Sequence, residues 1–123
     1  MTVEQVRASL LEDRVESKEH GEDGVTDAAI AVCEKLATHI GLDSGLNPDH
    51  VRMAAFGCDD GSASFALSCE HTGRRIDFVV SSRGSHCICM QMPAKLNGDT
   101  AVIPADPDDP VRIRSLTHWV LRG

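Results

Sequence analysis

The sequence predicts a two-layer α+β domain in which an antiparallel meander of four to five strands is covered by helices. Residues 51–92 form four short runs in which apolar and polar side chains alternate, as they do along pleated strands. An N-terminal helix over about residues 27–40 and a C-terminal helix over about residues 110–122 are predicted by apolar residues at helical spacing. Because a sheet with one apolar face must be covered, we expect these two helices to cover it.

The length, net charge and cysteines of the chain limit its expected number of domains, its kinds of partner and its compartment. At 123 residues it is long enough for one core and too short for two ordinary domains, so residues 1–123 are predicted to form a single domain. Its net charge of −7 opposes binding to nucleic acid or to an anionic membrane. The start of the chain lacks signal-peptide features, and the five cysteines are predicted to be reduced thiols. We therefore expect a cytoplasmic protein.

Residues 1–24 are predicted to contain a short helix and an acidic linker. Thr2 and Gln5 have the spacing of a capping box, and the apolar residues near them recur at helical intervals, which predicts a helix over residues 3–14. Residues 12–24 carry six acidic and two basic side chains, a composition typical of a solvated linker. The apolar face of this helix is narrow, so the sequence leaves open whether it docks on the sheet.

The two covering helices have recognisable starts. Thr26 is a good N-cap, and Asp27 follows it in the first turn, where the helix dipole favours a negative charge. Asp109 followed by Pro110 is the pattern of an N-cap with proline at the first helical position. The acidic side chains at these two places are therefore partly explained by helix initiation.

Glycine-containing polar segments separate the strands. Pro93 removes a backbone donor and ends the fourth run, and residues 101–103 are predicted to add a short edge strand that Pro104 stops. Asn97 and Gly98 form a typical turn pair before that edge strand. The other turns are expected at residues 57–61, 70–73 and 82–85, and residues 43–49 connect the helix to the first strand.

The face of the sheet that no helix covers is the predicted binding surface. Trp119 is the second candidate: its helical spacing favours a core position, although tryptophan is also enriched at interface hot spots. From both features we predict binding roles for Trp119, Arg75, Asp77 and Gln91. The alternation places on the polar face of the sheet the side chains of Arg75, Asp77, Ser81, Cys87, Cys89 and Gln91.

No catalytic or metal motif stands out. Cys87 and Cys89 project from the same side of a strand, but neither a C-x-x-C nor an H-x-x-x-H pair accompanies them, so they are weak candidates for zinc ligands. Cys58 lies beside two aspartates, which disfavour its thiolate and argue against a reactive nucleophile. We predict no catalytic residue, no metal site and no cofactor.

These observations favour a non-catalytic protein-interaction module, similar in size and charge to chaperones, adaptors or immunity proteins. Its predicted partner is another protein or a second copy of the chain, bound through the sheet. The alternative is a small-ligand or metal-binding domain with thiol or hydrolytic activity, which would use the Cys87 and Cys89 face and a nearby histidine. The sequence does not decide between an enzyme and a binding protein, although it favours the latter.

Overall fold

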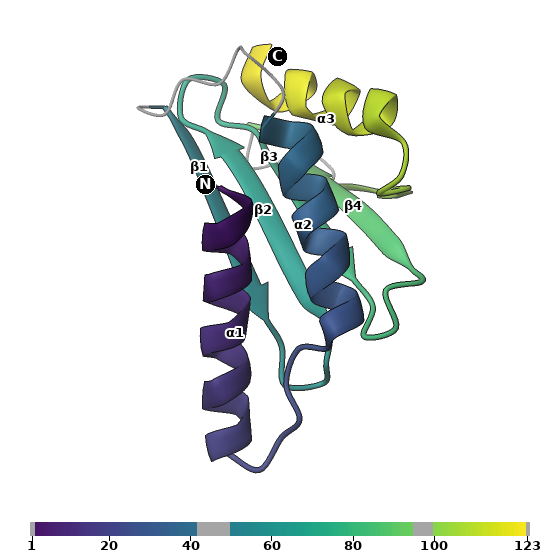
Figure 1. Cartoon of the computed structure of the whole chain (residues 1–123). Helices are drawn as coiled ribbons and strands as arrows, with labels where there is room; N and C mark the ends of the chain where they lie inside the picture. The colour runs from purple at the N-terminus through teal and green to yellow at the C-terminus, as the bar shows by residue number, and fades with distance from the viewer. Residues whose placement is uncertain (1, 42–49, 95–99, 123) are drawn as a thin grey trace.

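The computed structural model describes residues 2–41, 50–94 and 100–122 and confirms the predicted α+β architecture (Figure 1). Five strands form one antiparallel sheet in chain order, a complete meander. The predicted connection over residues 43–49 and the Asn97-Gly98 turn lie outside the described residues. The elements are α1 (Val3–Glu19), α2 (Asp27–Gly41), β1 (Val51–Gly57), β2 (Ala63–Cys69), β3 (Arg75–Val80), β4 (Cys87–Met92), β5 (Ala101–Pro104) and α3 (Pro110–Arg122).

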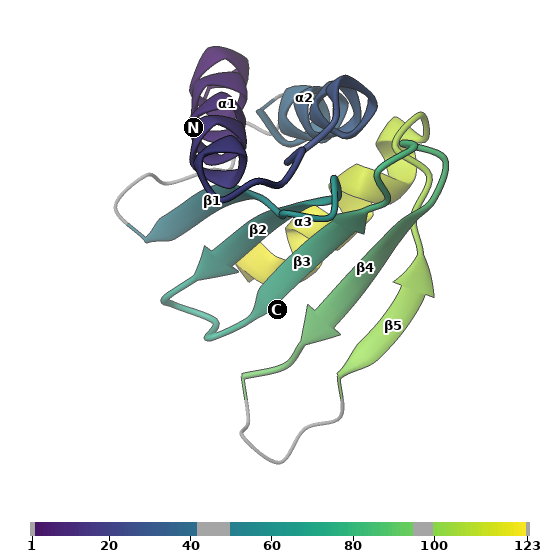
Figure 2. The ribbon, with the colours of Figure 1, turned by 90° about the horizontal axis from the view of Figure 1, so that it is seen from below.

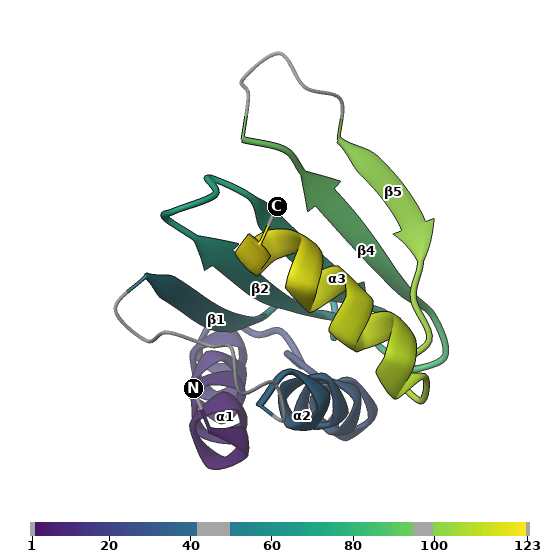
Figure 3. The same ribbon diagram turned by 90° about the horizontal axis from the view of Figure 1, so that it is seen from above.

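All three helices contribute to a single core with one face of the sheet. Figures 2 and 3 show α1 and α2 side by side along one side of the sheet and α3 crossing over β2 and β3. Phe65 and Phe78 are opposite each other on β2 and β3, and both are fully buried. Around them lie aliphatic side chains and thiols, as expected for a chain with three phenylalanines and no tyrosine. Among the described helices, none has the length and apolar character needed to cross a membrane.

The helix starts are as predicted. Thr2 and Gln5 form both hydrogen bonds of a capping box at the start of α1. The Thr26 hydroxyl accepts a hydrogen bond from the Ala29 N–H, and a carboxylate oxygen of Asp109 accepts one from the Arg112 N–H. Each of these bonds satisfies a backbone donor that the first turn of a helix leaves unpaired.

Helix α1 is longer than the predicted range of 3–14, because it continues to Glu19. Val6 and Leu10 are fully buried and pack in the common core. Polar residues of the second half of α1 also contact the rest of the protein: Ser17 is buried, and its hydroxyl lies 2.6 Å from a carboxylate oxygen of Asp59. Contacts with β1 and α2 therefore support a helix through residues whose composition resembles a linker.

The turn at Gly84 brings the β3–β4 connection against α2. Gly84 has a φ of 70°, and a Cβ atom at this position would lie 3.0 Å from the Ala28 carbonyl oxygen. Only glycine meets both conditions without strain. The turn therefore fixes the start of α2 over the end of the sheet.

Candidate functional site

The face of the sheet that points away from the helices carries the candidate site. Directly paired residues of antiparallel strands share a face, so the pairing defines three rows across the sheet. We call this surface the open face. Its rows are Arg52, Ser68, Arg75 and Met92; then Ala54, Ala66, Asp77, Met90 and Val102; and then Phe56, Ser64, Val79, Ile88 and Pro104.

Large apolar side chains are exposed across the open face. Phe56 on β1 is 52% exposed, Ile88 on β4 is 38% exposed and Val102 on β5 is 59% exposed. They belong to strands at opposite sides of the sheet, with Val79 between them in the pairing. Ile88 and Val102 lie on neighbouring strands, and Phe56 is separated from them by β2 and β3. Large exposed apolar patches are typical of interaction sites, whereas single exposed apolar residues are common on any protein.

Fewer polar residues lie on this face than the sequence suggested. The prediction that Cys87, Cys89 and Gln91 share the open face is wrong. Cys87 and Cys89 pair with Val80 and Phe78, both fully buried, and Gln91 pairs with Ile76 on the same helix-covered side. The reason is that β4 has apolar side chains on both faces, so its alternation alone does not tell which face is buried.

Arg75 and Asp77 do lie together on the open face. Nε of Arg75 donates a hydrogen bond of 2.7 Å to Oδ1 of Asp77, and Nη2 donates one of 3.1 Å to Oδ2. The Asp77 side chain is only 14% exposed, whereas that of Arg75 is 49% exposed. The pair thus places a partly buried carboxylate and an accessible guanidinium in the middle of an otherwise mainly apolar surface.

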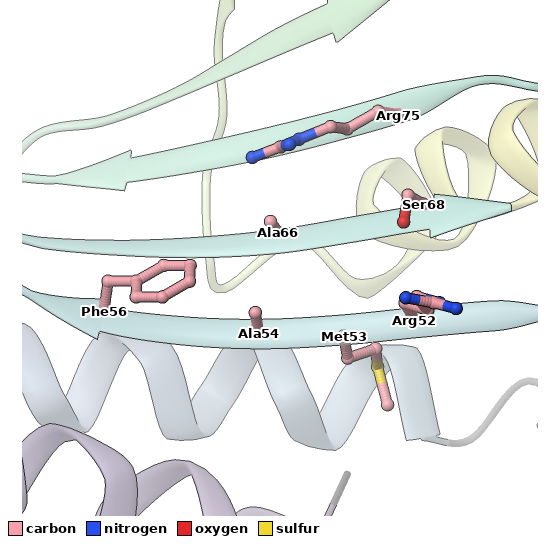
Figure 4. Close-up of a pocket in the computed structure, with 7 residues that line it drawn as sticks. All are labelled: Arg52, Met53, Ala54, Phe56, Ala66, Ser68 and Arg75. Atoms are coloured by element: carbon pink, nitrogen blue, oxygen red, sulfur yellow. The ribbon is translucent and has the colours of Figure 1, made fainter.

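A shallow hollow opens on the open face between β1 and β3 (Figure 4). Ala54 and Ala66, paired across β1 and β2, form its floor, and Phe56 lies at one end. Arg52 and Ser68 lie at the other end, and the Arg75 side chain extends along β3 so that its guanidinium lies beside Ala66. We call it the alanine hollow. Its volume is about 130 Å³, and its lining consists of Arg52, Met53, Ala54, Phe56, Ala66, Ser68 and Arg75.

Both edges of the sheet are protected against further strands. At the β1 edge, the Ser9 hydroxyl donates a 3.0 Å hydrogen bond to the Ala55 carbonyl, and Asp13 accepts one of 2.7 Å from the Gly57 N–H. At the other edge, Pro104 in the four-residue strand β5 has no N–H to donate. Side chains of α1 and a proline therefore limit strand addition at either side.

Trp119 lies apart from the open face. It is partly buried on α3 and packs against the core on the helix-covered side of the sheet. The Arg74 guanidinium lies over its ring, 4.8 Å from the ring centre. The structure thus brings together Arg75 and Asp77, but neither Trp119 nor Gln91 joins them. A binding role for each of these residues stays a prediction.

Three buried thiols, Cys33, Cys87 and Cys89, are held in their neutral form. Burial raises the pKa of Cys89 and of Cys33 to about 12 and that of Cys87 to about 11. The negative charge of Asp106 adds to the effect on the pKa of Cys87. A nucleophilic or metal-binding cysteine needs the thiolate form, so this environment opposes both roles. Within residues 2–41, 50–94 and 100–122, no group of three His, Cys, Asp or Glu side chains is arranged to hold a metal ion.

A second hollow, of about 420 Å³, lies where β4 begins and β5 ends. Its lining includes Cys87, Asp106 and His86, whose Nδ1 is 3.0 Å from the Ser85 hydroxyl. The imidazole thus contacts the Ser85 hydroxyl, whereas the Cys87 thiol contacts the Ile88 carbonyl oxygen at 4.0 Å.

The exposed apolar residues were not among the predicted binding residues. The prediction that Cys87 and Cys89 lie on the polar face implied that Ile88, which alternates with them, lies on the covered face. Phe56 and Val102 had no predicted role. The one available signal was the alternation of Ile88, Met90 and Met92, which describes an apolar face without telling whether a helix covers it. No protein-family model matches this sequence, and no curated protein and no solved structure matches it either.

Proposed function

We propose that this protein is a non-catalytic interaction module that binds a partner protein through the open face of its sheet. The observation that carries the proposal is that three large apolar side chains, Phe56, Ile88 and Val102, are exposed on the face opposite the helices. Burial of apolar surface is the main source of free energy in most protein association. The ion pair of Arg75 and Asp77 on this face can orient a bound partner and favour partners with complementary charges.

The protected edges support binding to the face in preference to strand addition. Ser9 and Asp13 occupy main-chain groups of β1, and Pro104 removes a donor from β5. Proteins that bind an extended peptide as an additional strand need free main-chain groups along one edge. The side chains of the open face are therefore the better contact surface.

The net charge favours a different polypeptide over a second copy. Two copies would bring together two molecules that each carry a charge of −7, which opposes self-association.

The test is site-specific photo-crosslinking in the cells that produce the protein, followed by identification of the crosslinked polypeptide. A photoreactive residue at Ser64, which lies between Phe56 and Val79 on the open face, is expected to capture one defined partner. The same residue at Arg114, an exposed position of α3, is the control and is expected to capture none. Sedimentation of the purified protein separately reports whether it self-associates.

A matched pair of substitutions completes the test. Val102 on the open face and Val15 on α1 are each 59% exposed, so Val102→Lys and Val15→Lys make the same chemical change on two different surfaces. Val102→Lys is expected to reduce capture at least tenfold while the fold is retained, and Val15→Lys is expected to leave capture unchanged. Capture from Arg114 alone, or equal effects of the two substitutions, would overturn the proposal. If sedimentation shows a stable dimer and the open face is its interface, then the partner is a second copy of this chain and the proposed separate partner protein is rejected.

A further inference from the structure

We infer that His50 and His71 form a binding site for a divalent transition-metal ion of the class that imidazole nitrogens prefer: Zn²⁺, Cu²⁺ or Ni²⁺. His50 directly precedes β1, and His71 lies in the turn between β2 and β3. The centres of the two imidazole rings are 3.8 Å apart. The site lies outside the two hollows described above, and the inference does not depend on the proposed function.

The two rings lie closer together than aromatic side chains usually do. Aromatic pairs in proteins prefer ring centres about 4.5–7 Å apart. The imidazole planes of His50 and His71 are inclined by 59°, so the rings are not stacked in parallel. Two rings that bind one ion must converge, because each directs a nitrogen toward the same point. The spacing of the two histidines in the chain follows no metal motif, so only the folded structure brings them together.

The backbone holds both residues in place. The Glu70 N–H donates a 2.9 Å hydrogen bond to the His50 carbonyl oxygen, which continues the pairing of β1 with β2 by one residue. In the turn that carries His71, Gly73 has a φ of 69°, and its N–H donates a 2.9 Å hydrogen bond to the Cys69 carbonyl oxygen. Ligands that are held in place before binding lose less conformational freedom when the ion binds.

Both rings keep nitrogen atoms for a metal ion. Among the residues that the structure describes, neither imidazole forms a hydrogen bond or an ion pair. His71 is exposed and His50 is partly buried, so an ion can reach the pair from solvent. The neighbouring Glu70 carboxylate is bound to the Arg52 guanidinium at 3.1 Å. The described part of the chain offers no third ligand here, so two imidazoles bind the ion and water completes its coordination.

The chemistry of the two ligands selects the class of ion. A neutral imidazole nitrogen suits Zn²⁺, Cu²⁺ and Ni²⁺, whereas Mg²⁺ and Ca²⁺ prefer oxygen ligands. Zn²⁺ binds an imidazole nitrogen at about 2.0–2.1 Å. Because His71 is exposed, its side chain can rotate until one nitrogen of each ring reaches the same ion. Binding of the second imidazole is then intramolecular, so the pair binds more tightly than either ring alone.

The experiment is a titration of the isotope-labelled full chain with Zn²⁺, carrying Cys58→Ser to remove the exposed thiol as a competing ligand. The imidazole NMR signals of His50 and His71 are expected to shift together and to saturate with one ion per chain. The signals of His20 and His86, two exposed histidines elsewhere in the chain, are expected to stay unchanged over the same range. Mg²⁺ at the same concentrations is expected to shift none of these signals.

Variants in the same background identify the ligands. His50→Gln and His71→Gln each remove one imidazole and are expected to weaken Zn²⁺ binding at least about tenfold in calorimetry. His20→Gln is the matched control and is expected to have no effect. Amide spectra without metal show whether each variant is folded. Since His71 is exposed, His71→Gln supplies the test even if replacement of the partly buried His50 disturbs β1.

Three results would overturn the inference. The first is the absence of any shift of the His50 and His71 signals at millimolar Zn²⁺, and the second is a shift of only one of them, which would assign the ion to a single histidine. The third is an equal effect of His71→Gln and His20→Gln on Zn²⁺ binding. Each of these results leaves the proposed function standing, because crosslinking from Ser64 tests the open face without metal.

Discussion

The guanidinium of Arg74 lies over the ring of Trp119, and Nη1 of the same side chain donates a 2.9 Å hydrogen bond to the Trp119 carbonyl oxygen. Arg74 follows the turn between β2 and β3, so this contact joins the sheet to the last turn of α3. The Thr72 hydroxyl of the same turn donates a hydrogen bond to the Val120 carbonyl. Carbonyl groups that the end of a helix leaves unpaired are thus satisfied by the sheet.

The first prediction concerns this contact. Arg74→Met retains the aliphatic part of the side chain but removes the charge and the hydrogen bond, and it is expected to lower the free energy of unfolding by about 1–2 kcal/mol. Trp119 is the single tryptophan, so its emission is expected to shift to longer wavelength as one face of its ring becomes hydrated. A urea titration followed by tryptophan fluorescence measures both changes. Arg114→Met on α3 is the control, and an equal loss of stability in it would contradict the assignment.

The second prediction concerns alkaline pH. The folded-state pKa values of Cys33, Cys87 and Cys89, about 12, 11 and 12, lie above the value of about 8.5 for an unfolded chain. In this range the unfolded state loses thiol protons that the folded state keeps. The free energy of unfolding is therefore unaffected below about pH 8.5 and falls between about pH 9 and the folded-state values. Each thiol contributes up to about 1.4 kcal/mol per pH unit.

Urea titrations between pH 8 and pH 10.5 measure this dependence. The protein contains no tyrosine, so no phenol titrates in the same range. Cys89→Ala is expected to make the decline with pH shallower, whereas Cys58→Ser, which replaces the exposed thiol, is expected to leave it unchanged. A decline that Cys89→Ala leaves equally steep would show that other groups cause it.

The third prediction concerns the β1 edge. Asp13→Ala leaves the Gly57 N–H without its acceptor, so a loss of about 1–2 kcal/mol in the free energy of unfolding is expected. Asp13→Asn keeps a side-chain oxygen and is expected to lose less than half as much. The exposed residue Glu16 on the same helix supplies the control Glu16→Ala. Chemical denaturation measures the loss, and light scattering detects association through the freed edge; equal losses in the alanine and asparagine variants would reject the hydrogen bond as its cause.

The fourth prediction concerns the start of α2. The Thr26 hydroxyl accepts from the Ala29 N–H and donates to the Ser82 carbonyl, while the Thr26 N–H donates to the Gly61 carbonyl. Thr26→Ala is expected to cost about 1–2 kcal/mol of stability, because both hydroxyl bonds are lost. Thr26→Ser keeps the hydroxyl and is expected to retain most of the stability in thermal unfolding. If Thr26→Ser lowers the stability as much as Thr26→Ala does, packing of the Thr26 methyl group contributes more than the hydroxyl hydrogen bonds.

Short-range patterns in the sequence determined most of the fold. The capping residues Thr2, Thr26 and Asp109 act on backbone groups three residues away, so each is visible in a few letters of sequence. The alternation in β2 and the turn glycines likewise describe local backbone geometry. The strand pairing then followed from the short connections, because neighbouring strands joined by tight turns pair antiparallel.

Tertiary contacts decided what local patterns left open. In β4 both faces are apolar, so only pairing with Phe78 and Val80 determines that Cys89 and Cys87 are buried while Ile88 is exposed. The acidic half of α1 resembles a linker in composition, yet Asp13 caps a strand 44 residues away in the chain. Such contacts depend on which surfaces meet after folding, so the spacing of neighbouring residues does not predict them. The open face is the clearest case, because the alternation of its strands describes a face while only the placement of three helices on the other side leaves it exposed.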